Sequence, residues 1–388
     1  MTTSTDDLTH MAEAVQLARL GLYSTSPNPR VGCVIVEQGE VIGRGFHVQA
    51  GGPHAEIHAL QSVAEQHRPR LARATVYVTL EPCSHQGRTG PCCQALVDAG
   101  VARVVYAMQD PNPQVAGRGL AMMRAAGLQV DGPLLESEAQ ALNPGFIRRM
   151  SQGRPYIRIK LAASLDGRTA MASGESQWIT GPAARAQVQA LRAQSCAVIS
   201  GHSTVSHDSA RLTVRGEQLS NVGAAPLGHP VAESIRQPLR VVLDGTGGLS
   251  GTEDFFAEPY PILWLTRHQQ AAVASHVQIL DLSDASGRVN LPALVAELAR
   301  RDCNELLVEA GPTLAGHFVE QGLVDELIVF VAPTLMGSNG RPLIALPLAS
   351  MSEKIDLNIV DIRAVGNDWR ITARPLSPQT EQSPQNRR

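Results

Sequence analysis

The chain has 388 residues, of which 43% are hydrophobic and 18% are charged, and its formal net charge is -3. This length indicates two domains, and the composition is that of an ordinary globular protein. The charge supplies no global basic field for nucleic acid or anionic lipid, and no apolar run reaches the roughly 18 residues that a bilayer span needs. We therefore expect no nucleic-acid partner and no membrane partner.

The N-terminus and the cysteines indicate a reduced, cytoplasmic protein. Residues 1–9 are polar and acidic, without the basic and apolar regions of a signal peptide. Six cysteines in a chain of this length do not indicate a disulfide framework. Cys83, Cys92 and Cys93 fall within eleven residues, which favours metal binding or catalysis.

The first 150 residues alternate between predicted strands and helices. Periodicity and turn residues predict helices over 7–22, 53–65, 91–99 and 119–126, and strands over 31–36, 41–45, 75–80, 101–108 and 128–130. Loops are expected at 26–29, 81–90 and 110–113. The alternation predicts an α/β layered domain that ends near residue 150.

A second domain is predicted after the boundary segment 151–155. Strands are expected at 156–162, 196–200, 240–243, 262–265, 277–280, 305–308, 326–331 and 357–362, and helices at 183–194, 291–300 and 313–321. Residues 216–238 have no clear period and are expected to form a surface loop. The tail, 377–388, has no apolar residue and is expected to be disordered.

The strongest chemical signal is the set His54, Glu56, Cys83 and Cys92. One imidazole and two thiolates are three ligands for a catalytic zinc, whose fourth position is left for water. Glu56 follows His54 by two residues and is the candidate general acid/base, the arrangement of zinc nucleobase deaminases. Bound zinc lowers the pKa of its water toward ~7. His54 and Cys92 both fall at predicted helix starts, and at Cys92 the positive end of the helix dipole favours the thiolate.

A structural zinc site is the alternative, and it would need a fourth protein ligand. Cys93 and His85 are the candidates for that ligand. Cys93 follows Cys92 directly and points about 100° away around a helix, so we assign it to the core. The remaining cysteines lie in or beside apolar runs and are expected to pack in the core: Cys33, Cys196 and Cys303.

Eight stretches, two of which contain this signature, carry a wider pattern along the chain: 27–32, 54–59, 79–93, 110–113, 117–119, 160–168, 173–180 and 308–314. Together they resemble the family of bifunctional riboflavin-biosynthesis deaminase/reductases, over roughly residues 8–375. The eight residues between Cys83 and Cys92 depart from the Cys-x-x-Cys spacing of cytosine and adenosine deaminases. We expect that loop to help shape the substrate pocket.

The resemblance implies an α/β fold with two domains. Residues 1–150 would form a cytidine-deaminase-like α/β/α domain, and residues 151–376 a dihydrofolate-reductase-like α/β domain. The implied reactions are hydrolytic deamination of 2,5-diamino-6-(5-phosphoribosylamino)pyrimidin-4(3H)-one and then reduction of the ribosyl side chain of 5-amino-6-(5-phosphoribosylamino)uracil to ribityl. The implied cofactors are Zn²⁺ and NADPH, the partners are small phosphorylated pyrimidines, and the assembly is a homo-oligomer.

The resemblance also implies residues of the deaminase pocket. It places Asn28 and His85 on the pocket wall and Asp110 and Asn112 near the substrate. Turn formation is the alternative role for Asn28, Asp110 and Asn112, because Asn and Asp before Pro favour turns.

The second domain lacks a Gly-x-Gly-x-x-Gly motif after a strand, so a Rossmann site is not supported. Its predicted strand 305–308 is followed by Gly311 and a helix, and a glycine turn before a helix can approach a phosphate. The resemblance assigns cofactor contacts to Ala162, Trp178, Thr204, Asp208, Gly245, Gly311, Pro312, Thr313, Leu314, Ala315, Gly316 and His317. It assigns substrate contacts to Ser176, Arg192, Leu212, Arg215 and Glu309.

Some of these positions have other interpretations. Arg192 could instead lie on a solvated helix face, and Trp178 could cap the core. Many relatives carry an Asp-Asp-Pro run before the substrate Leu and Arg, whereas this chain has the run Asp208-Ser209-Ala210-Arg211. Many relatives also carry Ser at the position of Gly245. The departures leave the Asp208 and Gly245 contacts open.

Two rival functions share part of the signature. A nucleic-acid deaminase would use the same zinc ligands, but the net charge of -3 and the lack of a basic patch with interleaved aromatics argue against it. A zinc-stabilised binding protein would need no general base, so the three-ligand count with Glu56 argues against that function.

Overall fold

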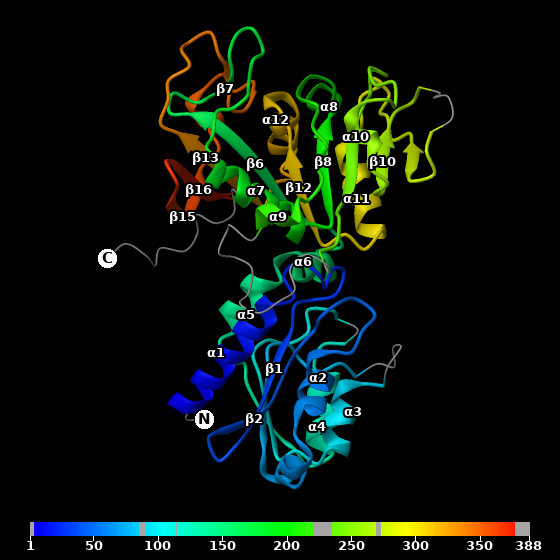
Figure 1. Ribbon diagram of the computed structural model, residues 1–388, viewed down its shortest axis with the longest axis vertical. Helices are drawn as coiled ribbons and strands as arrows, with labels where there is room; N and C mark the ends of the chain where they lie inside the picture. Colours follow the sequence, from blue (N-terminus) through cyan, green and yellow to red (C-terminus); the bar gives the residue numbers. More distant parts are fainter. Residues whose placement is uncertain (1–3, 85–89, 114, 220–234, 269–272, 377–388) are drawn as a thin grey trace. The chain divides into compact units, whose positions relative to one another are not determined.

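The computed structural model describes residues 4–84, 90–113, 115–219, 235–268 and 273–376 (Figure 1). The chain divides into two compact units: the first runs to Pro155 and also takes in the short turn Asp302–Asn304, and the second begins at Tyr156. His85, the tail 377–388 and most of the predicted loop 216–238 lie outside the described residues. Every described helix is too short or too polar to cross a membrane.

The first unit is built on a five-stranded sheet with the order β2-β1-β3-β4-β5. β1 is antiparallel to both β2 and β3, whereas β3, β4 and β5 run parallel. All six residues of β1 are buried, which fits a central strand with helices on both faces. The strands are β1 (Gly32–Glu37), β2 (Glu40–Phe46), β3 (Thr75–Val78), β4 (Arg103–Tyr106) and β5 (Gln129–Asp131).

Helices cover both faces of this sheet, so the α/β/α layering expected from the resemblance is confirmed. Its helical elements are α1 (Thr5–Arg19), α2 (Ala55–Ser62), η1 (Glu65–Arg73), α3 (Cys92–Asp98), α4 (Arg118–Ala125), α5 (Glu136–Leu142) and α6 (Pro144–Gln152). α1 and α5 lie on one face, and α2, α3 and α4 lie on the other (Figure 1). Sequence patterns missed α5 and α6, each of which is under three turns long and offers too short a period to detect.

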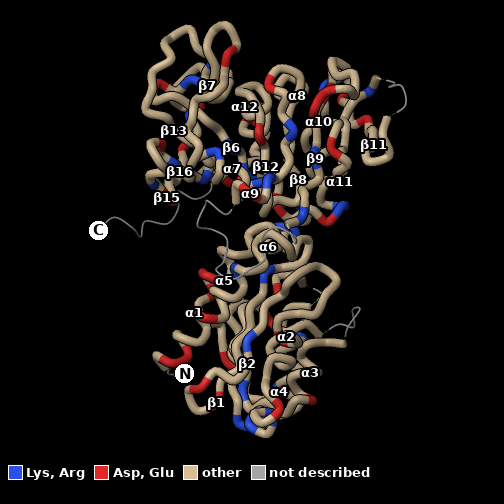
Figure 2. The backbone as a smooth tube through the Cα atoms, in the orientation of Figure 1, with Lys and Arg blue, Asp and Glu red and all other residues tan. Residues whose placement is uncertain are grey.

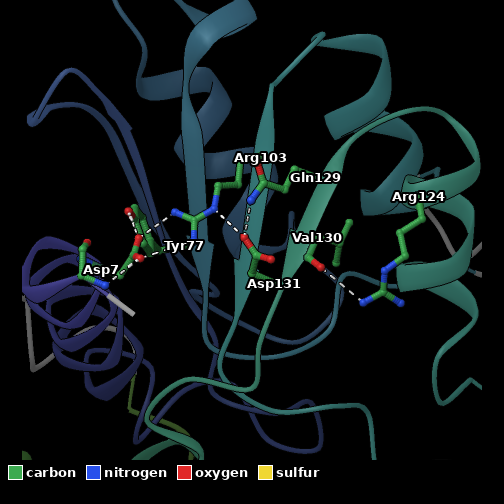
Figure 3. A network of polar contacts seen from close by, with 8 residues as sticks. Asp7, Tyr77, Arg103, Arg124, Gln129, Val130 and Asp131 are labelled. Carbon is green, nitrogen blue, oxygen red and sulfur yellow. Dashed lines mark hydrogen bonds and ion pairs between the residues drawn. The ribbon is translucent and has the colours of Figure 1, made fainter. Parts of the chain in front are cut away.

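A buried polar network fastens α1 to the sheet (Figure 3). The Asp7 carboxylate accepts hydrogen bonds from Tyr77 Oη (2.7 Å) and Arg103 Nη1 (2.7 Å), and Arg103 Nε donates to Asp131 Oδ2 (2.7 Å). Asp7 also forms a capping box with Ser4 at the start of α1. The hydrogen bond from Arg103 lowers the pKa of Asp7 to about 2.

The second unit is built on a nine-stranded sheet with the order β11-β10-β9-β8-β12-β6-β13-β16-β15. Seven strands are parallel, and β16 and β15 complete one edge in antiparallel fashion. β14 and β7 form a separate pair. The strands are β6 (Tyr156–Ser164), β7 (Arg168–Ala170), β8 (Ala197–Gly201), β9 (Leu239–Leu243), β10 (Ile262–Leu265), β11 (Val277–Leu280), β12 (Glu305–Glu309), β13 (Glu326–Ala332), β14 (Arg341–Pro342), β15 (Leu357–Val365) and β16 (Asp368–Pro375).

The helical elements of the second unit are α7 (Pro182–Gln194), α8 (His202–Asp208), α9 (Gly216–Leu219), α10 (Asp254–Ala257), α11 (Leu291–Arg300), α12 (Pro312–Glu320) and η3 (Met351–Glu353). The largest fully buried apolar side chains among the described residues are Trp264, Phe255, Phe318 and Phe330, which pack around the parallel strands. The carboxyl ends of parallel strands meet at one edge, so β6, β8, β9 and β12 deliver their following residues to the same place. Dihydrofolate-reductase-like α/β architecture, the predicted fold class of this half, is confirmed.

Candidate active sites

Two helix N-termini and one loop segment bring three metal-binding side chains together in the first unit. His54 is the N-cap residue of α2, and Cys92 is the first residue of α3. Cys83 comes from the segment after β3, and its Sγ accepts the Cys92 backbone N–H at 3.3 Å. The ligand atoms of the three residues lie within 4.8 Å of one another.

The spacing of these atoms fits zinc. His54 Nδ1 lies 3.3 Å from Cys92 Sγ and 3.6 Å from Cys83 Sγ. A tetrahedral site with zinc–sulfur bonds of ~2.3 Å and a zinc–nitrogen bond of ~2.0 Å places nitrogen and sulfur about 3.5 Å apart. The donor set therefore matches a three-ligand catalytic site, which a purely structural centre would complete with a fourth protein ligand.

Electrostatics around the trio favour a thiolate and a carboxyl group that can carry a proton. Hydrogen bonds from the Cys92 thiol and from His54 lower the pKa of the Cys83 thiol, despite its burial. Glu56 lies in the first turn of α2 and is 3% exposed. Burial raises the pKa of Glu56 to about 7, and the negative charge of Cys83 adds to that rise.

The remaining cysteines belong to the core, as predicted. Cys93 is fully buried, and its Sγ contacts Met122 Sδ at 3.3 Å, away from the ligand trio. Cys33, Cys196 and Cys303 are buried as well, and all six cysteines are free of disulfides.

Asn28 contacts His47, whose ring lies next to that of the ligand candidate His54. The sequence patterns did not identify His47. Asn28 Nδ2 is 3.0 Å from His47 Nε2, and His47 Nδ1 contacts Pro53 O at 2.9 Å. The ring centroids of His47 and His54 are 5.3 Å apart, edge to face. His47 gave no signal in the sequence because a single histidine next to a strand end has no spacing to match.

The loop after β4 holds the other two predicted pocket residues. Asp110 Oδ1 accepts the Asn112 backbone N–H at 2.8 Å, so the turn role weighed for Asp110 is present. The Asn112 carbonyl accepts the N–H groups of Val115 and Ala116, each at 2.9 Å. Asp110 and Asn112 therefore both take part in the turn structure that follows β4.

In the second unit, several predicted cofactor positions converge on the carboxyl edge of the sheet. Ala162 lies near the end of β6, Thr204 in α8 directly after β8, Gly245 just after β9, and Gly311 just after β12. β9, β8, β12 and β6 are consecutive neighbours in the sheet. The arrangement provides one continuous edge for an extended ligand.

The N-terminus of α12 suits a phosphate of NADPH. Gly311 is its N-cap, no side chain caps the helix, and a Cβ added at Gly311 would meet nothing within 4 Å. Main-chain N–H groups there can therefore face a ligand. Ala315 and Gly316 are buried instead, and a Cβ added at Gly316 would lie 2.0 Å from the Ala345 carbonyl oxygen.

The loop between β7 and α7 adds two more predicted contacts. Ser176 Oγ donates to Asp208 Oδ1 at 3.2 Å, which joins a predicted substrate residue to a predicted cofactor residue. Trp178 is 70% exposed, so the alternative that it caps the core is wrong. The Arg185 guanidinium carbon lies 4.6 Å from the centre of the Trp178 ring.

The predicted substrate residues are held in different ways. Arg192 and Glu309 form a two-point ion pair, and the Arg192 side chain is only 14% exposed, so the solvated-face alternative for Arg192 is wrong. Leu212 is 2% exposed and packs in the core, which leaves its main chain for any ligand contact. Arg215 is exposed, and its main-chain N–H donates to Gln189 Oε1 at 3.0 Å.

Lys160 is a second residue that sequence reasoning did not assign to the site. It is paired in register with Glu309 across β6 and β12. Burial lowers the pKa of Lys160, and the Glu309 carboxylate opposes that effect. In the sequence, Lys160 could have been found as a lysine within the largely apolar strand 156–162, because lysine is rarely buried.

The fold and the metal trio define a class: a zinc-dependent deaminase joined to a reductase domain. A family model for the cytidine and deoxycytidylate deaminase zinc-binding region matches residues 4–108. A family model for the RibD C-terminal domain matches residues 155–371.

Full-length relatives narrow the class further. The riboflavin biosynthesis protein RibD of Escherichia coli K12 is 49% identical, over 92% of this chain and 96% of the relative. RibD of Haemophilus influenzae is 43% identical, over 96% and 98% of the two chains. This chain belongs to the RibD family of riboflavin biosynthesis proteins.

Solved structures agree with this assignment. RibD of Acinetobacter baumannii, form 1, is 42% identical with a TM-score of 0.86, covering 96% of this chain and 99% of that one. A diaminohydroxyphosphoribosylaminopyrimidine deaminase/5-amino-6-(5-phosphoribosylamino)uracil reductase from Thermotoga maritima is 33% identical with a TM-score of 0.83, covering 95% and 98%. The chain is thus a bifunctional deaminase and reductase that uses Zn²⁺ and NADPH.

Proposed function

We propose that residues 1–150 remove the 2-amino group of 2,5-diamino-6-(5-phosphoribosylamino)pyrimidin-4(3H)-one as ammonia, and that residues 151–376 reduce the product, 5-amino-6-(5-phosphoribosylamino)uracil, at its ribosyl side chain. The observation that carries the proposal is the trio His54, Cys83 and Cys92 with the buried Glu56 beside it. The two compact units, which meet in sequence at Pro155, support the division of labour.

In the first unit, the side chains hold the metal and move the proton. His54, Cys83 and Cys92 hold zinc, which when bound lowers the pKa of water toward ~7 and supplies a nucleophile at neutral pH. Glu56 takes a proton from the attacking water and returns a proton to the departing amino group. Asn28 orients the pyrimidine in this proposal, which its contact with His47, a neighbour of His54, supports. Asp110 and Asn112, with His85, complete the proposed pocket.

In the second unit, the carboxyl edge binds the cofactor and the substrate. NADPH, when bound, supplies the hydride for reduction of the ribosyl carbon. The N-terminus of α12, with Gly311–His317, holds a cofactor phosphate, and Ala162, Trp178, Thr204, Asp208 and Gly245 line the same edge. The proposed substrate residues are Ser176, Arg192, Leu212, Arg215 and Glu309. Arg215, which is exposed, offers a planar fork for the substrate phosphate.

The distribution of charged residues along the chain supports small-molecule substrates. Acidic and basic residues are interspersed along both units (Figure 2), and a mixed pattern favours a small ligand over a polyanion. We assign the enzyme to the cytoplasm, which its six free cysteines support.

We also propose that the enzyme is a homo-oligomer. The edge hairpin of β15 and β16 exposes apolar side chains, with Ile359 at 55%, Ile362 at 53% and Trp369 at 52%. Such side chains on an edge hairpin suit contact with a second copy. Sedimentation at several concentrations should give a mass above the 41.4 kDa of one chain, and a purely monomeric sample would contradict the proposal.

A coupled assay tests the proposed reactions. Zinc-loaded protein is given the diaminopyrimidine phosphate, and ammonia and NADPH absorbance are followed separately. Ammonia should appear without NADPH, and NADPH consumption should begin only when deaminated product is present. Ammonia release from a nucleic acid but not from the pyrimidine phosphate would contradict the assignment.

A further inference from the structure

Glu81 is a buried carboxylate that none of the proposed steps uses. It lies between β3 and the zinc-ligand candidate Cys83, next to Pro82, and is 2% exposed. Its own N–H donates to the Met108 carbonyl oxygen at 2.9 Å, which ties its main chain to the residues that follow β4. The side chain thus starts from a fixed backbone position.

Both carboxylate oxygens of Glu81 accept main-chain N–H groups from the segment after β4. Oε2 accepts from Asp110 (3.2 Å) and Gly117 (2.9 Å), and Oε1 accepts from Gly119 (3.0 Å) and Leu120 (3.4 Å). All four donors lie 29 or more residues away in sequence. A carboxylate bonded by several main-chain N–H groups is held firmly, since such charge-assisted bonds are stronger than neutral ones.

Two of these bonds cap α4 from another part of the fold. Gly117 is the N-cap of α4 and has a left-handed backbone (φ 78°). Because glycine has no side chain, the helix has no side-chain cap at its own N-cap residue. The N–H groups of Gly119 and Leu120 are among those that a helix leaves without an internal partner, and Glu81 satisfies both. The positive end of the helix dipole also stabilises the negative carboxylate.

The start of α4 packs directly against the segment that carries Cys83, and only a glycine at position 119 leaves room for this contact. A Cβ added at Gly119 would lie 2.1 Å from the Pro82 carbonyl oxygen. Glu81 and Pro82 therefore both contact the start of α4, one through hydrogen bonds and the other through packing. The segment that carries Cys83 and the segment that carries Asp110 meet at this single carboxylate.

We propose that Glu81 is a positioning residue for deamination, which sets the place of the Asp110–Asn112 turn relative to the metal-ligand segment at Cys83. The bond from Asp110 N–H to Glu81 fixes the first residue of that turn, and the bonds to α4 fix the segment that follows it. This inference rests on the proposed pocket roles of Asp110 and Asn112. A displacement of about 1 Å at such a segment is enough to cost up to ~10²-fold in efficiency.

Glu81→Gln is the direct test. It keeps the length of the side chain but replaces one acceptor oxygen with an NH₂ group that faces main-chain N–H donors. Tyr77→Phe is the matched control, because it removes one buried hydrogen bond, to Asp7, in the same sheet but on the side of α1. For each protein we would measure zinc per chain, melting temperature, kcat and KM for ammonia release, and NADPH-dependent reduction of supplied 5-amino-6-(5-phosphoribosylamino)uracil.

The expected signature is a rise in KM with zinc retained. In Glu81→Gln, KM for the diaminopyrimidine should rise about tenfold or more, with a smaller loss in kcat, since the turn contacts substrate in the ground state and the transition state alike. Tyr77→Phe should lower the melting temperature without moving KM. Reduction of the supplied uracil should match wild type in both variants.

Several results would overturn the inference. An unchanged KM in folded, zinc-loaded Glu81→Gln would overturn it, as would an equal rise in KM in Tyr77→Phe or a loss of zinc as large as that in a ligand variant. If Glu81→Gln does not fold, Glu81→Asp applies the same KM criterion, because its carboxylate keeps the charge but is one methylene too short to reach all four donors. Absence of ammonia release by wild type would instead contradict the proposed function itself.

Discussion

The Arg192 guanidinium and the Glu309 carboxylate form a two-point ion pair, with Arg192 Nε 2.6 Å from Glu309 Oε1 and Arg192 Nη2 3.0 Å from Glu309 Oε2. Arg192 Nη1 donates to the Thr213 carbonyl oxygen at 3.1 Å, so the same side chain also reaches the segment that carries Leu212 and Arg215. Burial alone would raise the pKa of Glu309, but the charge and hydrogen bonds of the Arg192 guanidinium outweigh that effect and lower it, with a smaller contribution from Lys160. Arg192 therefore organises the proposed substrate side of the reductase.

Glu309→Gln should cripple reduction and spare deamination. It removes the negative charge that pairs with Arg192, and loss of one partner of a buried ion pair costs about 3–5 kcal/mol. We expect kcat/KM for NADPH-dependent reduction to fall at least about tenfold, while ammonia release stays near wild type. Thermal melting of the variant separates a local effect from unfolding. A well-folded variant with normal reduction would refute the role of the pair.

Arg215→Ala should weaken binding of the phosphorylated substrate. Arg215 is exposed and has no ion pair among the described residues, so its guanidinium is available to a phosphate. We expect KM for the uracil substrate to rise and KM for NADPH to stay unchanged in steady-state assays. Arg211→Ala, which removes an exposed arginine paired with Asp254, is the control and should change neither value. Equal effects of the two substitutions would argue against a specific phosphate contact.

Cys83→Ser should remove zinc and deaminase activity together. The substitution replaces a thiolate with a hydroxyl, which is a poor zinc ligand at neutral pH. Metal analysis of the purified variant should show severe loss of zinc, and ammonia release should fall with it. Cys93→Ser is the control, since Cys93 packs against Met122 and should keep its zinc. Full zinc in single variants of all three proposed ligands would disprove the assignment.

Acid should destabilise the first unit through Asp7. The pKa of Asp7 is lowered from 3.8 to about 2 in the folded chain, so its contribution is complete above the unfolded value and is lost as pH falls toward 2. The contribution is about 1–2 kcal/mol, because solvent screens the partly exposed Arg103. Melting temperature should therefore fall more steeply below pH 5 in wild type than in Asp7→Asn. Parallel curves for the two proteins would contradict this.

Much of the fold followed from local patterns. The hairpin around Gly39, the strands 262–265 and 277–280 and the helix 291–300 were predicted at or near their observed bounds, since each has a clear period and turn residues at its ends. The final strand β16 was missed, although Trp369 and Ile371 alternate with Arg370 and Thr372 along it. Its pairing with β13, not its composition, makes it a strand.

The sequence predicted the metal-binding trio but not the ion pair and hydrogen bonds that connect distant parts of the chain. Helix starts at His54 and Cys92 follow from local sequence, so their convergence in the fold was foreseeable. The pairing of Arg192 with Glu309 was not, because 117 residues separate them and only the tertiary fold brings them together. The bonds of Glu81 to the start of α4 escaped prediction for the same reason.

The central claim, two independent sites in one chain, is tested most directly by Glu56→Gln. The substitution keeps the shape of the side chain and the zinc ligands but removes the proton carrier, and general acid/base groups typically contribute ~10²–10⁴-fold. The zinc-loaded variant is assayed for ammonia release from the diaminopyrimidine phosphate and, separately, for NADPH oxidation with supplied 5-amino-6-(5-phosphoribosylamino)uracil. We predict that ammonia release falls by at least ~10²-fold while NADPH oxidation stays at the wild-type rate. Loss of NADPH oxidation in the well-folded variant, or near-normal ammonia release, would contradict the account.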